Sequence, residues 1–205
     1  MPSIFTPADR QAIQERLLSE GEKMMLASGI TRMNLETLAH SAGIAKGTFY
    51  NFFRTKQHFI LAIIRRYQAQ RAEVLARETR SKQNSLTADQ AIQMYLSVYD
   101  PKENPFFRMR DRDLDWIAEK IPAEELFYPE MDLRCCGMIL SCVKDLRKDV
   151  DLRIVSNFSR MIMFTLMQQD NVHKEVLPQN IKMIVELVEA YIAGYPQERK
   201  DKHEV

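Results

Sequence analysis

The chain has 205 residues, and 45% of them are hydrophobic, so it is long enough to bury a sizeable core as one or two domains. Its 29 basic and 28 acidic residues give a net charge of +1, which excludes a chain that is strongly basic or acidic throughout. No apolar run reaches about 18 residues, and the N-terminus has no basic region followed by an apolar one. We therefore expect no membrane span, no secretory signal and a cytoplasmic location.

Few glycines, few alternating patterns and abundant i, i+3, i+4 apolar spacing predict an all-α fold. The first helix is expected to begin at Thr6 or Asp9 and to end near Gly29. The next helix is short, with leucine or alanine at positions 35, 38, 39 and 42 on one face. Gly43 follows, where a left-handed residue commonly ends a helix.

A second short helix is predicted to rest on the first through three rings, those of Phe49, Phe52 and Phe53. Its opposite side carries a cation, hydroxyls, an amide and a bare backbone. This arrangement is typical of a helix-turn-helix, whose second helix lies in the major groove of DNA. The candidate DNA-binding residues are Asn34, Lys46, Gly47, Thr48, Tyr50, Asn51 and Lys56.

Two of these residues are expected to read the base sequence. Lys46 can neutralise a phosphate or donate to guanine O6 and N7, and Asn51 can pair with adenine N6 and N7. Thr48 and Tyr50 can donate to phosphates, and Lys56 is expected to bind the DNA backbone at a helix start.

The segment AGIAKGTFYNFF, residues 42–53, resembles the N-terminal domain of TetR-family transcriptional regulators. The family pattern is small-Gly-hydrophobic-small-Lys-Gly-Thr-hydrophobic-Tyr-x-x-Phe. The match continues back through Ala27 and Gly29 and covers roughly the first third of the chain. Ala45 stands where a Ser or Thr normally caps the recognition helix, and Asn51 stands where His or Tyr is common.

The resemblance implies a helix-turn-helix domain over residues 1–66 and a helical ligand-binding and dimerisation domain over residues 67–205. The charge distribution agrees with this division. Residues 1–82 have 13 Lys and Arg against 7 Asp and Glu, a net charge of +6, whereas residues 83–205 have 16 against 21, a net charge of −5. A basic end suits phosphate binding, which counterion release makes dependent on salt.

The rest of the chain is predicted as helices from Lys56 to a break at 81–85, then near 87–99, 105–120, 124–147, 151–170 and 178–193. Pro129 can bend or delay the helix around it. The charged run from Arg108 to Asp115 is interpreted as a solvated, ion-paired face.

Methionines and aromatic residues in these helices predict an adaptable apolar cavity for a hydrophobic small molecule. The candidate ligand-binding residues are Met94, Tyr95, Phe107, Trp116, Met138, Cys142, Phe158 and Met161. The alternative, that these side chains only fill the core, stays open. By the resemblance, an effector in the cavity would bind the DNA-incompetent state preferentially.

The last two helices are apolar on more than one side, and extra apolar surface usually meets a partner. We predict a homodimer, which the resemblance implies is a four-helix bundle; two-fold symmetry then implies a palindromic operator. The candidate interface residues are Phe164, Met167, Ile184, Leu187, Val188 and Tyr191. Two central helices buried on all sides are the alternative.

No nucleophile elbow, metal-ligand spacing or phosphate loop is present, so we predict no enzyme activity, catalytic residue, metal or cofactor. Cys135, Cys136 and Cys142 predict no structural disulfide, although a thiol-based redox-responsive regulator stays an alternative. A helical protein-interaction module without DNA binding is another. A further alternative is that the two short helices only pack on each other. Gly47 argues against it, because glycine costs about 1 kcal/mol inside a helix and suits close approach to DNA. The predicted function is a dimeric transcriptional repressor, released from a palindromic DNA operator by a hydrophobic inducer.

Overall fold

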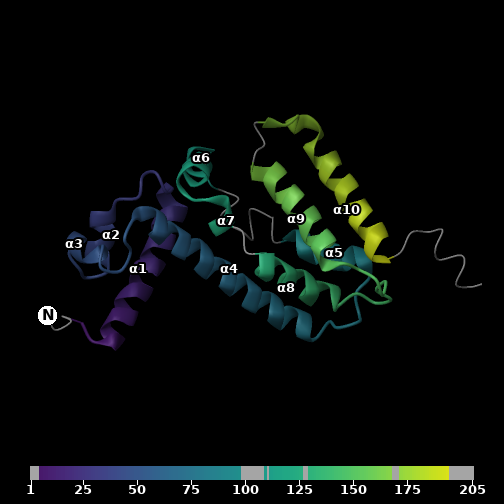
Figure 1. Ribbon diagram of the computed structural model, residues 1–205, viewed down its shortest axis with the longest axis horizontal. Coiled ribbons are helices and arrows are strands. Elements are labelled where there is room, and N and C mark those ends of the chain that lie inside the picture. Colours follow the sequence, from purple (N-terminus) through teal and green to yellow (C-terminus); the bar gives the residue numbers. More distant parts are fainter. Residues whose placement is uncertain (1–4, 98–108, 110, 127–128, 168–170, 194–205) are drawn as a thin grey trace, which may run out of the picture. The chain divides into compact units, whose positions relative to one another are not determined.

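The computed structural model describes residues 5–97, 109, 111–126, 129–167 and 171–193. Every regular element in these ranges is helical, which confirms the predicted all-α class (Figure 1). The α-helices are α1 (Pro7–Ser28), α2 (Leu35–Ser41), α3 (Lys46–Phe49), α4 (Lys56–Arg80), α5 (Ala88–Leu96), α6 (Asp111–Lys120), α7 (Ala123–Leu126), α8 (Pro129–Leu140), α9 (Leu152–Met167) and α10 (Leu177–Ala193), with a 3₁₀ turn, η4 (Lys174–Val176).

Backbone contacts divide the chain into two compact units. The first unit combines residues 1–70 with 108–127, and the second combines residues 71–107 with 128–205. The N-terminal unit is therefore built from two stretches of sequence, because α6 and α7 pack with it. None of the helices in the described part of the chain combines the length and apolar character that crossing a bilayer requires.

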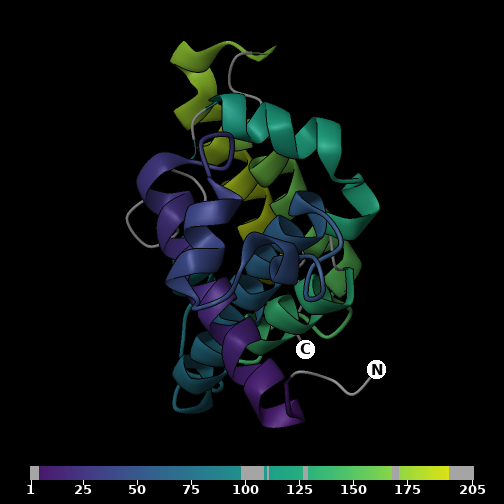
Figure 2. The ribbon, with the colours of Figure 1, turned by 90° about the vertical axis from the view of Figure 1, so that its left-hand side faces the viewer.

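The ends of the first two helices follow the sequence signals. Thr6 caps α1 in a capping box with Asp9, the two side chains each bonding the other's backbone N–H. Gly29 ends α1 at φ 87°, and Gly43 follows α2 at φ 77°, a backbone region that favours glycine. In Figure 2, α1 is the purple helix in front.

The core under the helix-turn-helix is a cluster of three phenylalanine rings. Phe49, Phe53 and Phe59 are at most 6% exposed, and their ring centroids lie 4.9 to 5.7 Å apart. The third ring of this cluster comes from α4. The prediction that Phe52 belongs to it is wrong, because α3 ends at Phe49 and the following turns direct Phe52 elsewhere.

The second unit packs α5, α8, α9 and α10 around a core that includes Leu75 from the end of α4. The predicted helix over 124–147 is wrong in extent. Pro129 begins α8, as suits a residue without a backbone N–H, and the helix ends at Leu140. Beyond it the backbone of Cys142 and Lys144 bonds to Leu86, so the chain leaves the helical path.

Candidate nucleic-acid interface

Helix α3 has one buried side and one exposed side. Phe49 is fully buried and anchors the helix on α4 and on the loop before it, because its ring meets those of Phe59 and Phe53. Tyr50 is 46% exposed and stands edge-on to the Phe49 ring, with 5.4 Å between centroids. The residues that face outward are Lys46, Gly47, Tyr50 and Asn51, with Thr48 half-buried beside them.

The structure gives no internal reason for a glycine at position 47. Among the described residues, no atom lies within 4 Å of a Cβ built on Gly47. Its φ also lies outside the left-handed region, which only Gly29 and Gly43 occupy among the described glycines. The absence of a side chain therefore leaves bare backbone at the surface, between the exposed Lys46 and the hydroxyl of Thr48.

The two short helices start differently. Asn34 caps α2, its Oδ1 accepting hydrogen bonds from the N–H groups of Glu36 and Thr37 at 2.8 and 3.3 Å. Ala45 precedes α3 and makes no side-chain cap, as the sequence predicted. Lys46 lies 3.7 Å from Glu36 in an exposed ion pair, which water and salt weaken enough to leave the ammonium available to a phosphate.

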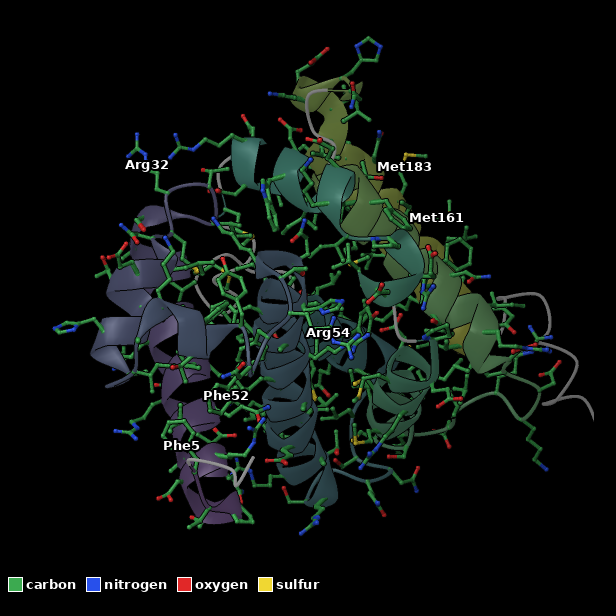
Figure 3. All side chains as sticks on the ribbon, turned by 60° about the vertical axis from the view of Figure 1, so that its left-hand side comes forward. Phe5, Arg32, Phe52, Arg54, Met161 and Met183 are labelled. Carbon is green, nitrogen blue, oxygen red and sulfur yellow. The ribbon has the colours of Figure 1, made fainter. Side chains whose placement is uncertain are left out.

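Arg10 on α1 supports the turn that follows α3, through contacts that the sequence pattern does not predict. The Arg10 side chain donates to the Asn51 carbonyl oxygen at 3.2 Å, and its guanidinium lies 5.0 Å from the centre of the Phe52 ring. Phe5 approaches the same ring at 6.3 Å, and Figure 3 shows the two rings together. No local pattern indicates such contacts, because Arg10 and Asn51 are 41 residues apart.

Lys56, predicted to contact phosphate, is already engaged within the unit. Its Nζ donates to the carbonyl oxygen of Met33 at 3.3 Å and lies 5.7 Å from the Trp116 ring centroid. Burial lowers the pKa of Lys56, while the carboxylate of Asp113 acts to raise it. Other cations flank the helix-turn-helix at the surface, and Figure 3 shows Arg32 and Arg54 pointing outward.

Comparison with known proteins agrees with this geometry. Residues 17–63 match the profile of the family described as bacterial regulatory proteins, tetR family. Over 56 residues the chain is 41% identical to the HTH-type transcriptional repressor NemR of Escherichia coli (strain K12). Residues 17–63 of this chain therefore form a helix-turn-helix domain of the tetR family type. The aligned segment spans 27% of this chain and only 28% of NemR, so this likeness concerns the helix-turn-helix region.

Two solved structures resemble the fold of this chain over most of its length. One is a proposed TetR-family transcriptional regulator from Mesorhizobium loti, with a TM-score of 0.60 and 15% identity, covering 91% of this chain and 98% of that one. The other is the reduced form of E. coli NemR, with a TM-score of 0.54 and 16% identity, covering 88% and 97%. At such identities the likeness shows the fold alone.

The C-terminal unit contains a small, partly open apolar cavity among α5, α8, α9 and α10. It measures about 30 Å³, and apolar groups surround it apart from Tyr95, Ser159 and the thiol of Cys136. Typical small-molecule pockets measure about 300 to 1,000 Å³, so a ligand of that size needs these helices to move apart.

The predicted ligand residues do not gather at this cavity. Tyr95 lines it, and Met94, Met138 and Phe158 pack against the same core. Cys142 is fully buried at the end of α8, Met161 is 53% exposed, and Trp116 lies in the N-terminal unit. Phe107 lies outside the described residues. Ligand binding by all eight residues remains a prediction.

Two of the three cysteines, Cys135 and Cys136, lie in environments that favour the protonated thiol. Burial raises the pKa of Cys135, and it raises the pKa of Cys136 to about 12. Cys142 is fully buried, and its Sγ donates to the carbonyl oxygens of Thr79 and Met138 at 3.6 and 3.5 Å. All three are free of disulfide bonds.

Helices α9 and α10 lie side by side and share an exposed apolar face, from which Met161 and Met183 project in Figure 3. The exposed apolar face consists of Ile154, Met161, Phe164, Met183 and Leu187, which are 40 to 67% exposed. Among the other predicted interface residues, Val188 is buried, Ile184 is half-buried, and Tyr191 accepts a hydrogen bond from the N–H of Asp151. The side chain of Met167 lies outside the described residues.

Proposed function

We propose that this protein is a DNA-binding transcriptional repressor that reads a palindromic operator as a homodimer and is released by an uncharged, hydrophobic small molecule. In a bacterial cell this function places it in the cytoplasm, where the DNA lies. The proposal is supported most directly by the surface of α3. Lys46, Tyr50 and Asn51 are exposed there around Gly47, where an added Cβ would meet no atom of the described residues within 4 Å.

The chemistry of this surface matches that of duplex DNA. An ammonium group and a hydroxyl suit phosphate, whereas an exposed amide suits the edge of an adenine in the major groove. Gly47 removes the side chain that would separate the helix backbone from the duplex. The net charge of +6 over residues 1–82 adds a long-range attraction to the polyanion.

The effector and the dimer rest on the C-terminal unit. Among the described residues that line the cavity of α5, α8, α9 and α10, none is charged, which favours an uncharged apolar ligand over an ion. Such a ligand releases DNA only if it binds the DNA-incompetent state more tightly. A second copy of the chain is the proposed partner of the exposed apolar face on α9 and α10, since that face leaves five large apolar side chains in water.

Selection of bound duplexes from a random pool tests the proposal and yields the operator. We expect sequence-selective binding whose affinity falls as salt rises. In the selected operator, Lys46→Ala should weaken binding to all sequences or relax one guanine position, whereas Asn51→Ala should lose about 1 to 3 kcal/mol of discrimination at an adenine. Lys148→Ala, which removes an exposed cation from the other unit and from outside residues 1–82, is the matched control and should change little.

Failure of the purified protein to bind any duplex at low ionic strength would favour the protein-interaction module instead. Equal loss on every sequence for Asn51→Ala would make Asn51 a backbone contact. The redox alternative is disfavoured by the raised pKa values of Cys135 and Cys136, since the thiolate is the reactive form. Mild oxidation and Cys142→Ser are therefore expected to leave the operator affinity unchanged, and a change in either would support that alternative.

A further inference from the structure

Helix α6 contributes a buried carboxylate to the unit that contains the helix-turn-helix. Asp113 is 1% exposed, although the neighbouring charged residues Asp111, Arg112 and Asp115 are exposed. The interpretation of this charged run as a solvated face is therefore wrong at Asp113. A buried charge is costly unless other groups bond to it, so its partners identify what it does.

The partners of Asp113 lie in the loop that leads from α1 into α2. Its Oδ1 accepts two hydrogen bonds from Thr31, one from the backbone N–H at 2.8 Å and one from the hydroxyl at 2.9 Å. Gly29 in the same loop lies so close that a Cβ there would stand 2.3 Å from Asp113 Oδ2. That second oxygen has no hydrogen-bond partner among the described residues. The carboxylate thus fits tightly over the loop that precedes α2.

A second residue of α6 reaches the other end of the helix-turn-helix. Trp116 follows Asp113 by three positions and so lies on the same side of the helix. Its ring lies 5.7 Å from the Nζ of Lys56, the first residue of α4, and that Nζ also donates to the carbonyl oxygen of Met33. Lys56 and Trp116 are both half-buried, and a cation–π contact in such surroundings is favourable. Helix α6 therefore contacts both the loop before α2, at Thr31, and the start of α4, at Lys56.

We propose that Asp113 and Trp116 are positioning residues, which fix α2 and α3 in the arrangement that reads DNA. This inference rests on the proposed DNA-binding function. The attraction of Asp113 to the half-buried Lys56 does not by itself account for a carboxylate at this place, because buried ion pairs can often be replaced by uncharged groups without loss of stability. An asparagine, for example, still offers Thr31 an acceptor oxygen.

Electrostatics and positioning predict opposite effects of Asp113→Asn on operator binding. Removal of a negative charge makes the basic unit more positive, which by itself strengthens attraction to phosphate. Loss of positioning instead misplaces the base-reading side chains of α3. We expect Asp113→Asn and Trp116→Leu in the full-length chain each to weaken operator binding about tenfold, comparable to the loss of one base contact. Affinity for unrelated duplex should stay constant or rise.

The matched control is Asp115→Asn, which removes the same charge from an exposed position two residues along α6. Affinities are measured by fluorescence anisotropy on the selected operator, at a temperature at which circular dichroism shows every variant folded. The proposal is supported if Asp113→Asn loses operator affinity and Asp115→Asn does not. It is overturned if folded Asp113→Asn binds the operator as tightly as wild type, or if both variants lose the same affinity.

Should Asp113→Asn fail to fold, Thr31→Val decides the matter, since it removes only the hydroxyl bond at 2.9 Å. A loss of about threefold or more in operator affinity supports the proposal, and an unchanged affinity overturns it. Wild-type protein that binds no duplex at all would overturn the proposed function as well as this inference. Wild-type binding with an indifferent Asp113→Asn overturns the inference alone.

Discussion

At Gly47, the fold and the proposed DNA contact make opposite demands on the side chain. A Cβ at this position meets open space, so alanine fits without strain and gives up less conformational entropy on folding. We predict that Gly47→Ala stabilises the protein by up to about 1 kcal/mol and at the same time weakens DNA binding. Urea unfolding measures the first effect, and anisotropy on the selected operator measures the second. Undiminished affinity would contradict a close approach of this backbone to DNA.

Single residues are predictable from sequence only where the pattern is local. Helical spacing around the buried Phe49 predicts that Lys46, Tyr50 and Asn51 are exposed. In the structure all three side chains are exposed. Partners that are distant in the chain are beyond such a pattern. Trp116 was assigned to the effector cavity, yet its ring lies beside Lys56, 60 residues earlier in the sequence.

Helix α3 is the element whose own sequence supports it least. It is one turn long and Ala45 offers no capping oxygen. Its position therefore depends on the buried Phe49 and on the hydrogen bond from Arg10 to the Asn51 carbonyl oxygen. A helix of this length is not stable by itself. Apolar spacing predicts a helix that continues through Phe53, because such spacing alone does not show where the backbone leaves the helical path for turns.

The missing cap can be supplied. Ala45 has the extended backbone of a cap residue, φ −73° and ψ 151°, and it is exposed. We predict that Ala45→Ser stabilises the protein by about 1 kcal/mol, because its hydroxyl can accept from a free N–H in the first turn. Urea unfolding measures this change, and Ala45→Val, which has no oxygen, is the control that should give no gain. Equal stability of the serine and valine variants would contradict the capping explanation.

On the scale of the whole molecule, the two units defined by backbone contacts differ from the two domains expected from the sequence. The predicted boundary after residue 66 lies within α4, whereas the structure also adds residues 108–127 to the N-terminal unit. Charge and the family pattern locate the helix-turn-helix, since both are properties of one continuous segment. The addition of α6 involves contacts such as the pairing of Asp113 with Thr31 across 82 positions, which no pattern within a single sequence reveals.

Self-association through the exposed apolar face remains a prediction. Leu187 on α10 is 44% exposed there, and a glutamate in its place would put a desolvated charge into the proposed interface. We predict that Leu187→Glu weakens association by at least about a hundredfold, which corresponds to a little under 3 kcal/mol, and so converts dimer to monomer at micromolar concentration. Sedimentation equilibrium measures this, with Leu26→Glu as the control, since Leu26 is exposed to a similar degree, 47%, on α1.

The same variant separates dimerisation from folding. Leu187 is already partly in water, so the monomer should keep its helical circular dichroism while its affinity for a two-site palindrome falls toward that for a single half-site. A wild-type chain that sediments as a monomer, or a Leu187→Glu variant that remains a dimer, would remove α9 and α10 as the interface. In the second case the partner surface must be sought on other exposed residues, since this face would then be covered by no second copy.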